Sequence, residues 1–275
     1  MALATPSLVV TTSRRRTAAL ASRAEQLAQW LGTRLVPREG SLADLCAAHG
    51  VLGAIVVGPE RITYHEPARS LRYFYHPGMA KVRLHSHRRG DPDPMIQAMD
   101  ARRGDEVLDC TLGRASDAIL VSWVVGEAGR VVGLEASGVL AALVREGVNH
   151  YADPNRALTA ALRRIECEWA DHREYLPQCR DDAFDIVYFD PLFDAPLEAS
   201  QAMAPLRALG EPSPLTAETV AEACRVARRR VVIKQRRGSA LWDEIRVDRV
   251  VSGRDSRVEY GVRFIGPKAG AASPS

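Results

Sequence analysis

The first third of the chain alternates short apolar runs with longer amphipathic stretches, a pattern typical of a small α/β unit. Ser41 with Asp44 three residues later predicts the capped start of a helix. The expected elements are a strand at 8–11, a helix at 17–31, a strand at 34–37, a helix at 41–49, and strands at 54–57, 61–65 and 71–75.

Between residues 76 and 94 the composition changes to His, Arg, Gly, Asp and Pro, which predicts a loop joining two units. We place the domain boundary in this segment. The prediction is a small α/β N-terminal domain over residues 1–90, with RNA binding as a candidate role, and a larger domain over residues 91–266. Residues 267–275 are Pro, Lys, Ala, Gly and Ser and predict a disordered tail.

Beyond residue 105, strand and helix patterns alternate, which predicts an α/β fold with a doubly wound, Rossmann-like parallel sheet. A short helix at 95–99 precedes it. Strands are expected at 106–110, 130–134, 163–168, 186–189 and 230–234, helices at 116–125, 139–150 and 217–227, and a closing pair of strands at 244–250 and 257–264.

Composition excludes several classes of protein. Hydrophobic residues make up 46% of the chain, enough for a sizeable core. There is no apolar run of about 18 residues and no signal-peptide pattern, so a cytoplasmic protein is expected. The five cysteines form no Cys-x-x-Cys pair, so we expect neither a disulfide framework nor a metal site.

The net charge is only +3, yet the basic residues are clustered. Such clusters can neutralise RNA phosphates or form ordinary solvated faces, and only their convergence in space distinguishes the two. The clusters are Arg14–Arg16, Arg88–Arg89, Arg228–Arg230, and Lys234 with Arg236 and Arg237. Aromatic residues at 64 and 73–75 could stack on bases, or fill half-buried strands.

Acidic residues stand at three successive strand ends, where α/β sheets bind ligands: Asp109, Glu135 and Asp171. Glu135 takes the position of an acid that binds ribose hydroxyls, and Asp171 could meet an adenine amino group. The turn from Thr111 to Asp117 has Gly113 as its one glycine, too few for close approach to a pyrophosphate. These residues therefore favour S-adenosylmethionine, which has no phosphates, over a dinucleotide.

A second candidate site follows the apolar strand that ends at Phe189. Asp190 can accept from an N–H, Pro191 has no competing backbone donor, and Phe193 offers a ring for stacking. This arrangement suits a flat exocyclic amine. Lys234, at the end of the fifth strand, could orient a base carbonyl or a phosphate, or be an ordinary surface lysine.

These motifs resemble the class I S-adenosylmethionine-dependent methyltransferases that modify guanine N2 in bacterial 16S ribosomal RNA. The similar segments run in order over about residues 88–237: 109–118, 134–143, 187–193 and 227–234. The resemblance implies cofactor or site contacts for Ser116, Asp117, Glu135, Ala136 and Asp190.

Three positions depart from that family's pattern. Ala115 stands at a glycine position and Ser116 at an arginine position, which could alter cofactor geometry or affinity, and Leu192 replaces a methionine. The N-terminal unit matches the family poorly, so the target could differ even where the chemistry is the same.

The predicted function is methylation of an exocyclic amine, guanine N2, in ribosomal RNA or a ribosomal small-subunit particle. Asp190 and the Pro191 carbonyl would accept from the amine, while Phe193 stacks and Lys234 orients. The predicted cofactor contacts are Asp109, Thr111, Gly113, Ser116, Asp117, Glu135, Ala136 and Asp171. Two alternatives remain: methylation of a protein carboxylate or small molecule, and a non-catalytic RNA-binding module.

Overall fold

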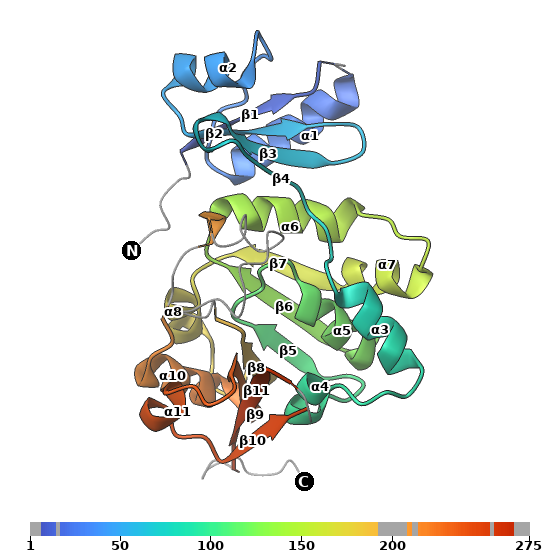
Figure 1. Ribbon diagram of the computed structural model, residues 1–275, viewed down its shortest axis with the longest axis vertical. Coiled ribbons are helices and arrows are strands. Elements are labelled where there is room, and N and C mark those ends of the chain that lie inside the picture. Colours follow the sequence, from blue (N-terminus) through green and yellow to red (C-terminus); the bar gives the residue numbers. More distant parts are fainter. Residues whose placement is uncertain (1–6, 15–16, 192–207, 211–213, 254–255, 267–275) are drawn as a thin grey trace.

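The strands of the computed structural model form two separate sheets (Figure 1). The structure describes residues 7–14, 17–191, 208–210, 214–253 and 256–266. The smaller sheet has the order β1-β2-β3-β4, with β1 parallel to β2 and the other pairs antiparallel. Its strands are β1 (Leu8–Thr12), β2 (Gly53–Val57), β3 (Ile62–Glu66) and β4 (Leu71–Tyr73), and a 3-10 turn at Pro67–Arg69 precedes β4.

The helices of this N-terminal unit begin at the predicted positions, and the predicted cap at Ser41 is confirmed. Thr17 caps α1 (Ala18–Trp30), and Ser41 forms a capping box with Asp44 at the start of α2 (Leu42–His49). The strand expected at 34–37 is reduced to a single bridge between Leu35 and Val10. Two backbone hydrogen bonds form this bridge: the Val10 N–H donates to the Arg34 carbonyl, and the Val36 N–H donates to the Val10 carbonyl.

The larger sheet has the order β10-β11-β9-β8-β5-β6-β7. Five strands are parallel, β11 is antiparallel to β9, and β10 is antiparallel to β11. The parallel strands are β5 (Glu106–Asp109), β6 (Arg130–Glu135), β7 (Ile165–Trp169), β8 (Phe184–Phe189) and β9 (Ala227–Arg236); the last two are β10 (Arg249–Ser252) and β11 (Val258–Phe264). The predicted Rossmann-like sheet is confirmed, and its direction of winding reverses between β5 and β8, where such sheets bind ligands.

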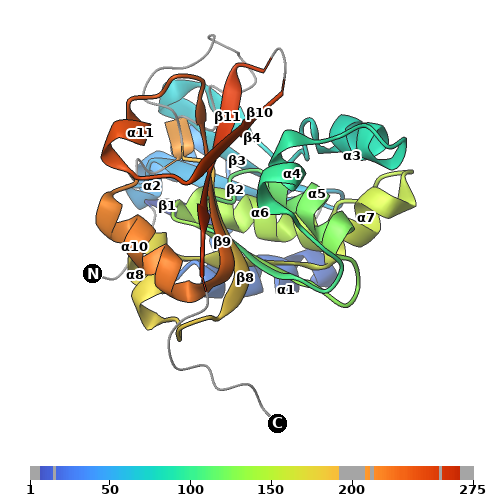
Figure 2. The same cartoon turned by 90° about the horizontal axis from the view of Figure 1, so that it is seen from below.

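Helices cover both faces of this sheet (Figure 2). Alternate strand residues face opposite cores: Val107 and Ile186 belong to one, Leu108 and Val187 to the other. The first face carries α3 (Ala80–Arg88), α4 (Pro94–Met99), α5 (Ser116–Val125) and α7 (Arg156–Arg163). The second carries α8 (His172–Tyr175), a 3-10 turn at Leu176–Gln178, α10 (Ala217–Val226) and α11 (Leu241–Glu244).

Helix α6 (Gly138–His150) lies between the two units (Figure 1). Its Val144 and Val148 pack into the core of the larger sheet, whereas Ala142 and Leu143 pack against the N-terminal sheet. An ion pair between Arg23 and Glu146 adds a polar contact at this junction. Burial on both sides of one helix fixes the N-terminal unit against the larger sheet.

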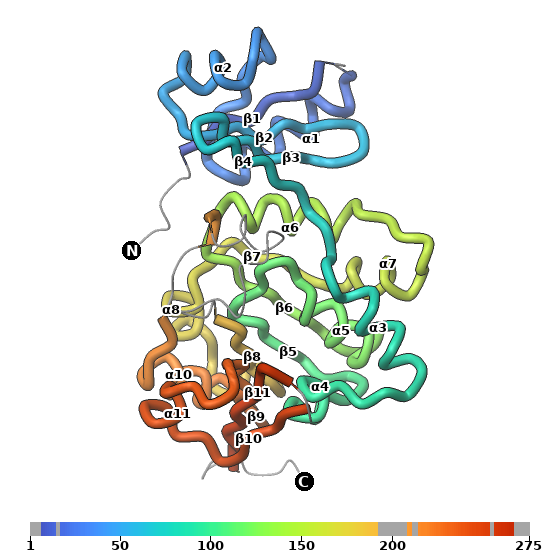
Figure 3. The backbone as a smooth tube through the Cα atoms, in the orientation of Figure 1, coloured from blue at the N-terminus to red at the C-terminus, as the bar shows by residue number. Residues whose placement is uncertain are grey.

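The segment expected to be a loop contains a helix, so that prediction was wrong. After β4 the chain runs past α6 and forms α3 (Figure 3). Ala80 and Leu84 are fully buried in the core beside Ile119 of α5, and this tertiary burial stabilises a segment of polar composition. The domain division near residue 90 stays a prediction, and α3 packs with the larger sheet.

Two further elements differ from expectation. Arg163 ends helix α7, so the third strand begins at Ile165 rather than two residues earlier. The strand expected at 244–250 begins only at Arg249, because α11 and its following turn occupy the first part. Among the described residues, no helix combines the length and apolar character needed to cross a bilayer.

Candidate cofactor and active site

A pocket of about 390 Å³ opens at the carboxyl ends of β5, β6, β8 and β9. It lies at the reversal of strand order, where the ends of parallel strands converge. The predicted site residues that line it are Asp109, Thr111, Gly113, Ser116, Asp117, Glu135, Ala136, Asp190, Pro191 and Lys234. Residues from four strand ends, far apart in sequence, thus share one cavity.

The turn after β5 is tight. Gly113 has φ of 51°, and Ala115 has φ of 58° in the left-handed region that disfavours a Cβ. Ala115 nevertheless adopts this left-handed conformation, which glycine reaches without strain. The turn therefore forms with alanine at the position where the resembled family has glycine. Leu112 packs so closely over Gly133 of β6 that a Cβ there would lie 2.3 Å from it.

Glu135 ends β6 with its carboxylate held by the backbone. The N–H of Gly113 donates to one oxygen at 3.1 Å, and the N–H of Ser137 donates to the other at 2.9 Å. The side chain lines the pocket although it is only 8% exposed. Two fixed donors orient the carboxylate at the position where acidic side chains bind ribose hydroxyls in nucleotide-binding sheets.

Asp171 is not part of this pocket. It caps α8 by accepting from the Arg173 N–H at 2.8 Å, and it forms an ion pair with the Arg173 guanidinium. A carboxylate is satisfied locally by this arrangement, and Asp171 lines a separate hollow beside Trp169. The structure thus gives no support to Asp171 as the adenine contact.

His172 lines the pocket instead, next to the position where Asp171 was expected. It is 3% exposed and stacks edge-on against Phe189 with 5.5 Å between ring centroids. Burial lowers its pKa, so the ring is neutral at pH 7. Its Nε2 has no hydrogen-bond partner among the residues that the structure describes. Sequence reasoning missed this residue, because nothing in the pattern distinguishes it from an ordinary helix-start histidine.

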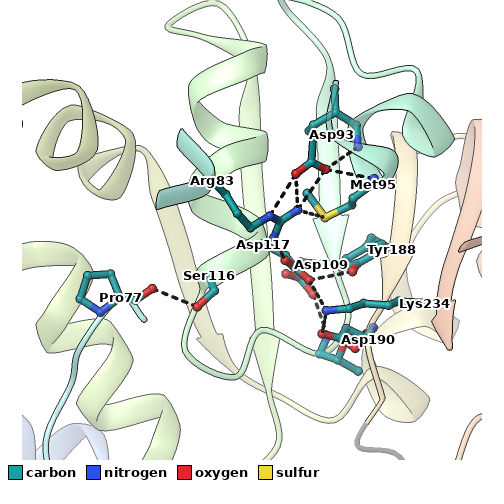
Figure 4. Close-up of polar contacts among 12 residues, drawn as sticks. Pro77, Arg83, Asp93, Met95, Asp109, Ser116, Asp117, Tyr188, Asp190 and Lys234 are labelled. Carbon is teal, nitrogen blue, oxygen red and sulfur yellow. Dashed lines mark hydrogen bonds and ion pairs between the residues drawn. The ribbon is translucent and has the colours of Figure 1, made fainter. Parts of the chain in front are cut away.

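A buried charge cluster forms the floor of the pocket (Figure 4). The Lys234 Nζ lies 2.7 Å from the Asp190 carboxylate and 3.1 Å from that of Asp117. Tyr188 donates to Asp117 at 2.8 Å, and Arg83 of α3 forms an ion pair with it from the other side. Lys234 is therefore an ion-pair partner of both carboxylates, and the surface-lysine alternative is wrong.

The environment splits the carboxyl pKa values within this cluster. Burial raises the pKa of Asp109 to about 8, and burial beside Asp117 raises that of Asp190 to about 6 despite the attraction of Lys234. Burial also acts on Asp117, but Lys234 and Arg83 hold its pKa below the usual range. At pH 7, Asp109 is thus mainly protonated while Asp117 and Asp190 are ionised.

Ser116 and Pro191 are further predicted site residues that line the pocket. The Ser116 hydroxyl donates to the Pro77 carbonyl at 3.0 Å, which ties the start of α5 to the connector (Figure 4). Pro191 lies at the mouth directly after the strand end, as the sequence predicts. Phe193, the predicted stacking residue, lies outside the described residues.

The arginine clusters do not form one face. Arg228 pairs with Glu106 and Asp185, while Arg229 and Arg230 pair with Asp100. These three guanidinium groups form ion pairs at the amino ends of the parallel strands, opposite the end that carries the pocket. They are therefore not assembled for phosphates.

Two further clusters that the structure describes are separated along α3 and β9, and Arg15 and Arg16 lie outside the described residues. Helix α3 runs beside α5 in the same direction, with Arg83 against Asp117 and His87 against Trp123. Arg88 and Arg89 therefore lie toward the end of α5 that is remote from the pocket. Arg236 and Arg237 instead follow Lys234 at the pocket end of β9.

The sequence of the chain matches a model of a known protein family. A family model described as "Putative SAM-dependent methyltransferase" matches residues 64–261, which include every strand end that lines the cavity. The chain belongs to this family. S-adenosyl-L-methionine is accordingly its cofactor, and the protein is a methyltransferase.

Relatives span nearly the whole chain. The uncharacterized protein YpiP of Bacillus subtilis (strain 168) is 35% identical over 92% of this chain and 98% of its own length. The ribosomal RNA small subunit methyltransferase J of Pseudomonas fluorescens (strain SBW25) is 23% identical, covering 86% of this chain and 89% of that protein. The predicted resemblance to the class I ribosomal RNA methyltransferases is thus confirmed by a distant homologue that carries that name.

A solved structure supports the fold. The methyltransferase NGO1261 from Neisseria gonorrhoeae superposes with a TM-score of 0.62 at 17% identity, covering 96% of this chain and 98% of the other. The coverage includes the N-terminal unit as well as the larger sheet. The Rossmann-like class I methyltransferase fold is confirmed.

Proposed function

We propose that this methyltransferase modifies an exocyclic amine, guanine N2, of ribosomal RNA. The observation that carries the proposal is the Asp190 carboxylate at the pocket floor, followed by Pro191 at its mouth and held by Lys234. A relative named as a ribosomal RNA small subunit methyltransferase, similar over 86% of this chain, supports RNA as the acceptor.

The residues of the pocket fit S-adenosylmethionine. Glu135 offers an oriented carboxylate to ribose hydroxyls, and the neutral ring of His172 lines the same cavity. The turn at Gly113 lines the cavity beside Glu135. When bound, the cofactor supplies an activated sulfonium methyl group.

Asp190 has the properties required to orient an amine. Its carboxylate is ionised at pH 7 and accepts hydrogen bonds, and Lys234 fixes its position. The Pro191 carbonyl adds a second acceptor with no backbone N–H alongside. Two acceptors hold the two amine hydrogens and direct the nitrogen lone pair into the pocket, and catalysis comes chiefly from this positioning.

An exocyclic amine is proposed over other acceptors because a flat group with two N–H donors matches two adjacent acceptors. The choice of guanine N2 follows the resemblance to the guanine-N2 methyltransferases. A protein carboxylate brings negative charge toward Asp190 and Asp117, which is unfavourable in a buried site. Phe193, proposed from the sequence, would stack on the base. Ribosomal RNA or the small-subunit particle is the proposed partner, and the cytoplasm the proposed location.

Nucleoside mass spectrometry of ribosomal RNA from a deletion strain tests the proposal. One N2-methylguanosine should disappear and return with the wild-type gene, but not with Asp190→Asn. Purified protein, labelled cofactor and RNA or small-subunit particles from the deletion strain then identify the form of the substrate. Unchanged N2-methylguanosine, with label transferred to protein or a small molecule, would refute the RNA assignment.

A further inference from the structure

Arg83 is a pocket residue that comes from outside the strand ends. It belongs to α3, within the segment that composition predicts to be a loop, and its side chain is 23% exposed. Its guanidinium contacts Asp93 through Nε at 3.0 Å and through Nη2 at 3.1 Å, and it reaches Asp117 through Nη1. Figure 4 shows this fork between the two carboxylates.

The contacts continue to the proposed amine site. Arg83 pairs with Asp117, Asp117 pairs with Lys234, and Lys234 pairs with Asp190. Lys234 thus carries one positive charge between two carboxylates, at 3.1 and 2.7 Å. Without a second cation, both acids would compete for a single ammonium group.

We propose that Arg83 is a positioning residue: by neutralising Asp117, it leaves the Lys234 ammonium to hold the Asp190 carboxylate in place. The inference rests on the proposed role of Asp190 in orienting the amine. It adds to that role a dependence on the connector between the two units, which delivers α3 to the pocket.

Other groups also face the cluster, and each acts on the same carboxylates. Asp117 is surrounded by Arg83 from α3, Lys234 from β9, Tyr188 and Asp190 from β8 and its end, Asp109 from β5, and Tyr260 from β11. Asp109 is mainly protonated at pH 7, and the tyrosines are neutral because burial raises their pKa values. Arg83 and Lys234 both contact Asp117, Lys234 also contacts Asp190, and Arg83 shares its charge with Asp93.

The test is the titration of Asp190 in protein labelled with ¹³C at aspartate carboxyl carbons. Its resonance is identified by loss in Asp190→Asn, and no acceptor substrate is required. In Arg83→Gln the midpoint should move up by about one pH unit, because Lys234 is then shared with an uncompensated Asp117. Arg83→Lys keeps the positive charge, so its Asp190 midpoint should lie close to the wild-type value.

Asp93→Asn provides a test of opposite sign. The amide of this variant can still cap α4, but it carries no negative charge to pair with Arg83. The Arg83 guanidinium then acts on Asp117 alone, so the Asp190 midpoint should not move up. Arg228→Gln is the matched control, since it breaks comparable ion pairs with Glu106 and Asp185 away from the pocket. It should lower stability without moving the Asp190 titration.

Methyl transfer then separates positioning from simple stabilisation. Arg83→Gln should lower kcat at pH 7 by about tenfold and move the acidic limb upward, with KM and cofactor affinity nearly unchanged. A wild-type titration midpoint and wild-type kcat in Arg83→Gln would overturn the inference. A shifted titration together with no RNA methylation by the wild-type protein would instead refute the proposed function and leave the electrostatic link intact.

Discussion

The backbone N–H of Asp190 donates to the hydroxyl of Thr111 at 2.6 Å, although the two residues are 79 positions apart. Thr111 belongs to the turn that lines the cofactor pocket, and Asp190 is the proposed amine contact. This hydrogen bond adds to the pairing of β5 with β8 in setting the distance between the two halves of the site. Catalysis by positioning is sensitive to this distance.

Thr111→Val should lower methyl transfer. The substitution keeps the shape of the side chain but leaves the Asp190 N–H without its acceptor, which costs about 1–3 kcal/mol. We expect kcat to fall by about 10- to 100-fold with a much smaller change in cofactor affinity. Thr111→Ser retains the hydroxyl and should stay near wild type. Equal rates for the Val and Ser variants would show that this hydrogen bond does not align the site.

Glu135→Ala should weaken cofactor binding. The lost hydrogen bonds involve a charged acceptor and are worth about 1.5–3 kcal/mol, or roughly 10- to 150-fold in affinity. Calorimetry with S-adenosylhomocysteine measures the change. Glu166→Ala on the neighbouring strand is the control, because that carboxylate pairs with Arg130 at the surface. If the Glu135 variant binds as tightly as the control, the ribose assignment is wrong.

The rate of methyl transfer should fall at acid pH. The pKa of Asp190 is raised to about 6, and only the ionised carboxylate accepts hydrogen bonds through both oxygens. Activity should therefore be lost as the pH falls through about 6. Asp190→Asn should be nearly inactive over the whole range while retaining its circular dichroism and melting temperature. Full activity at pH 5 in the wild-type protein would argue against the role.

Asp109 should destabilise the protein at high pH. Its pKa rises from 3.8 unfolded to about 8 folded, so the native state binds the proton more tightly. This contribution to stability is fully present below about pH 4 and is lost as the pH rises through 8. Asp109→Asn accepts from the Thr111 N–H as before but cannot ionise.

Urea unfolding at several pH values checks this linkage. The stability of Asp109→Asn relative to wild type should increase from pH 5 to pH 8.5, by an amount on the order of a few kcal/mol. Asp153→Asn is a control of opposite sign, because hydrogen bonds from the Asn155 N–H and Lys81 outweigh the effect of burial and hold the pKa of that carboxyl below its usual range. A difference between Asp109→Asn and wild type that does not vary with pH would contradict a raised pKa at Asp109.

Local sequence signals determined most of the fold. The alternation of apolar runs and amphipathic stretches predicted the parallel strands of the larger sheet, because each buried strand and its covering helix carry their own periodicity. Ser41 and Thr17 marked helix starts that the structure confirms, since a cap acts within three residues. The rule that strand ends converge found Asp109 and Glu135, which line the pocket, and also Asp171, which does not; Asp190 was found from the motif that follows its strand.

The tertiary structure alone decided which side chains meet. Helix α3 has the composition of a loop and forms because Ala80 and Leu84 are buried against α5. Arg83 is thereby carried to Asp117, 34 positions away, and no spacing in the sequence predicts that pair. Asp171 and His172 are adjacent, yet one caps a helix and the other lines the pocket. Capping is a short-range interaction, whereas entry into a pocket depends on the packing of strands and helices distant in the chain.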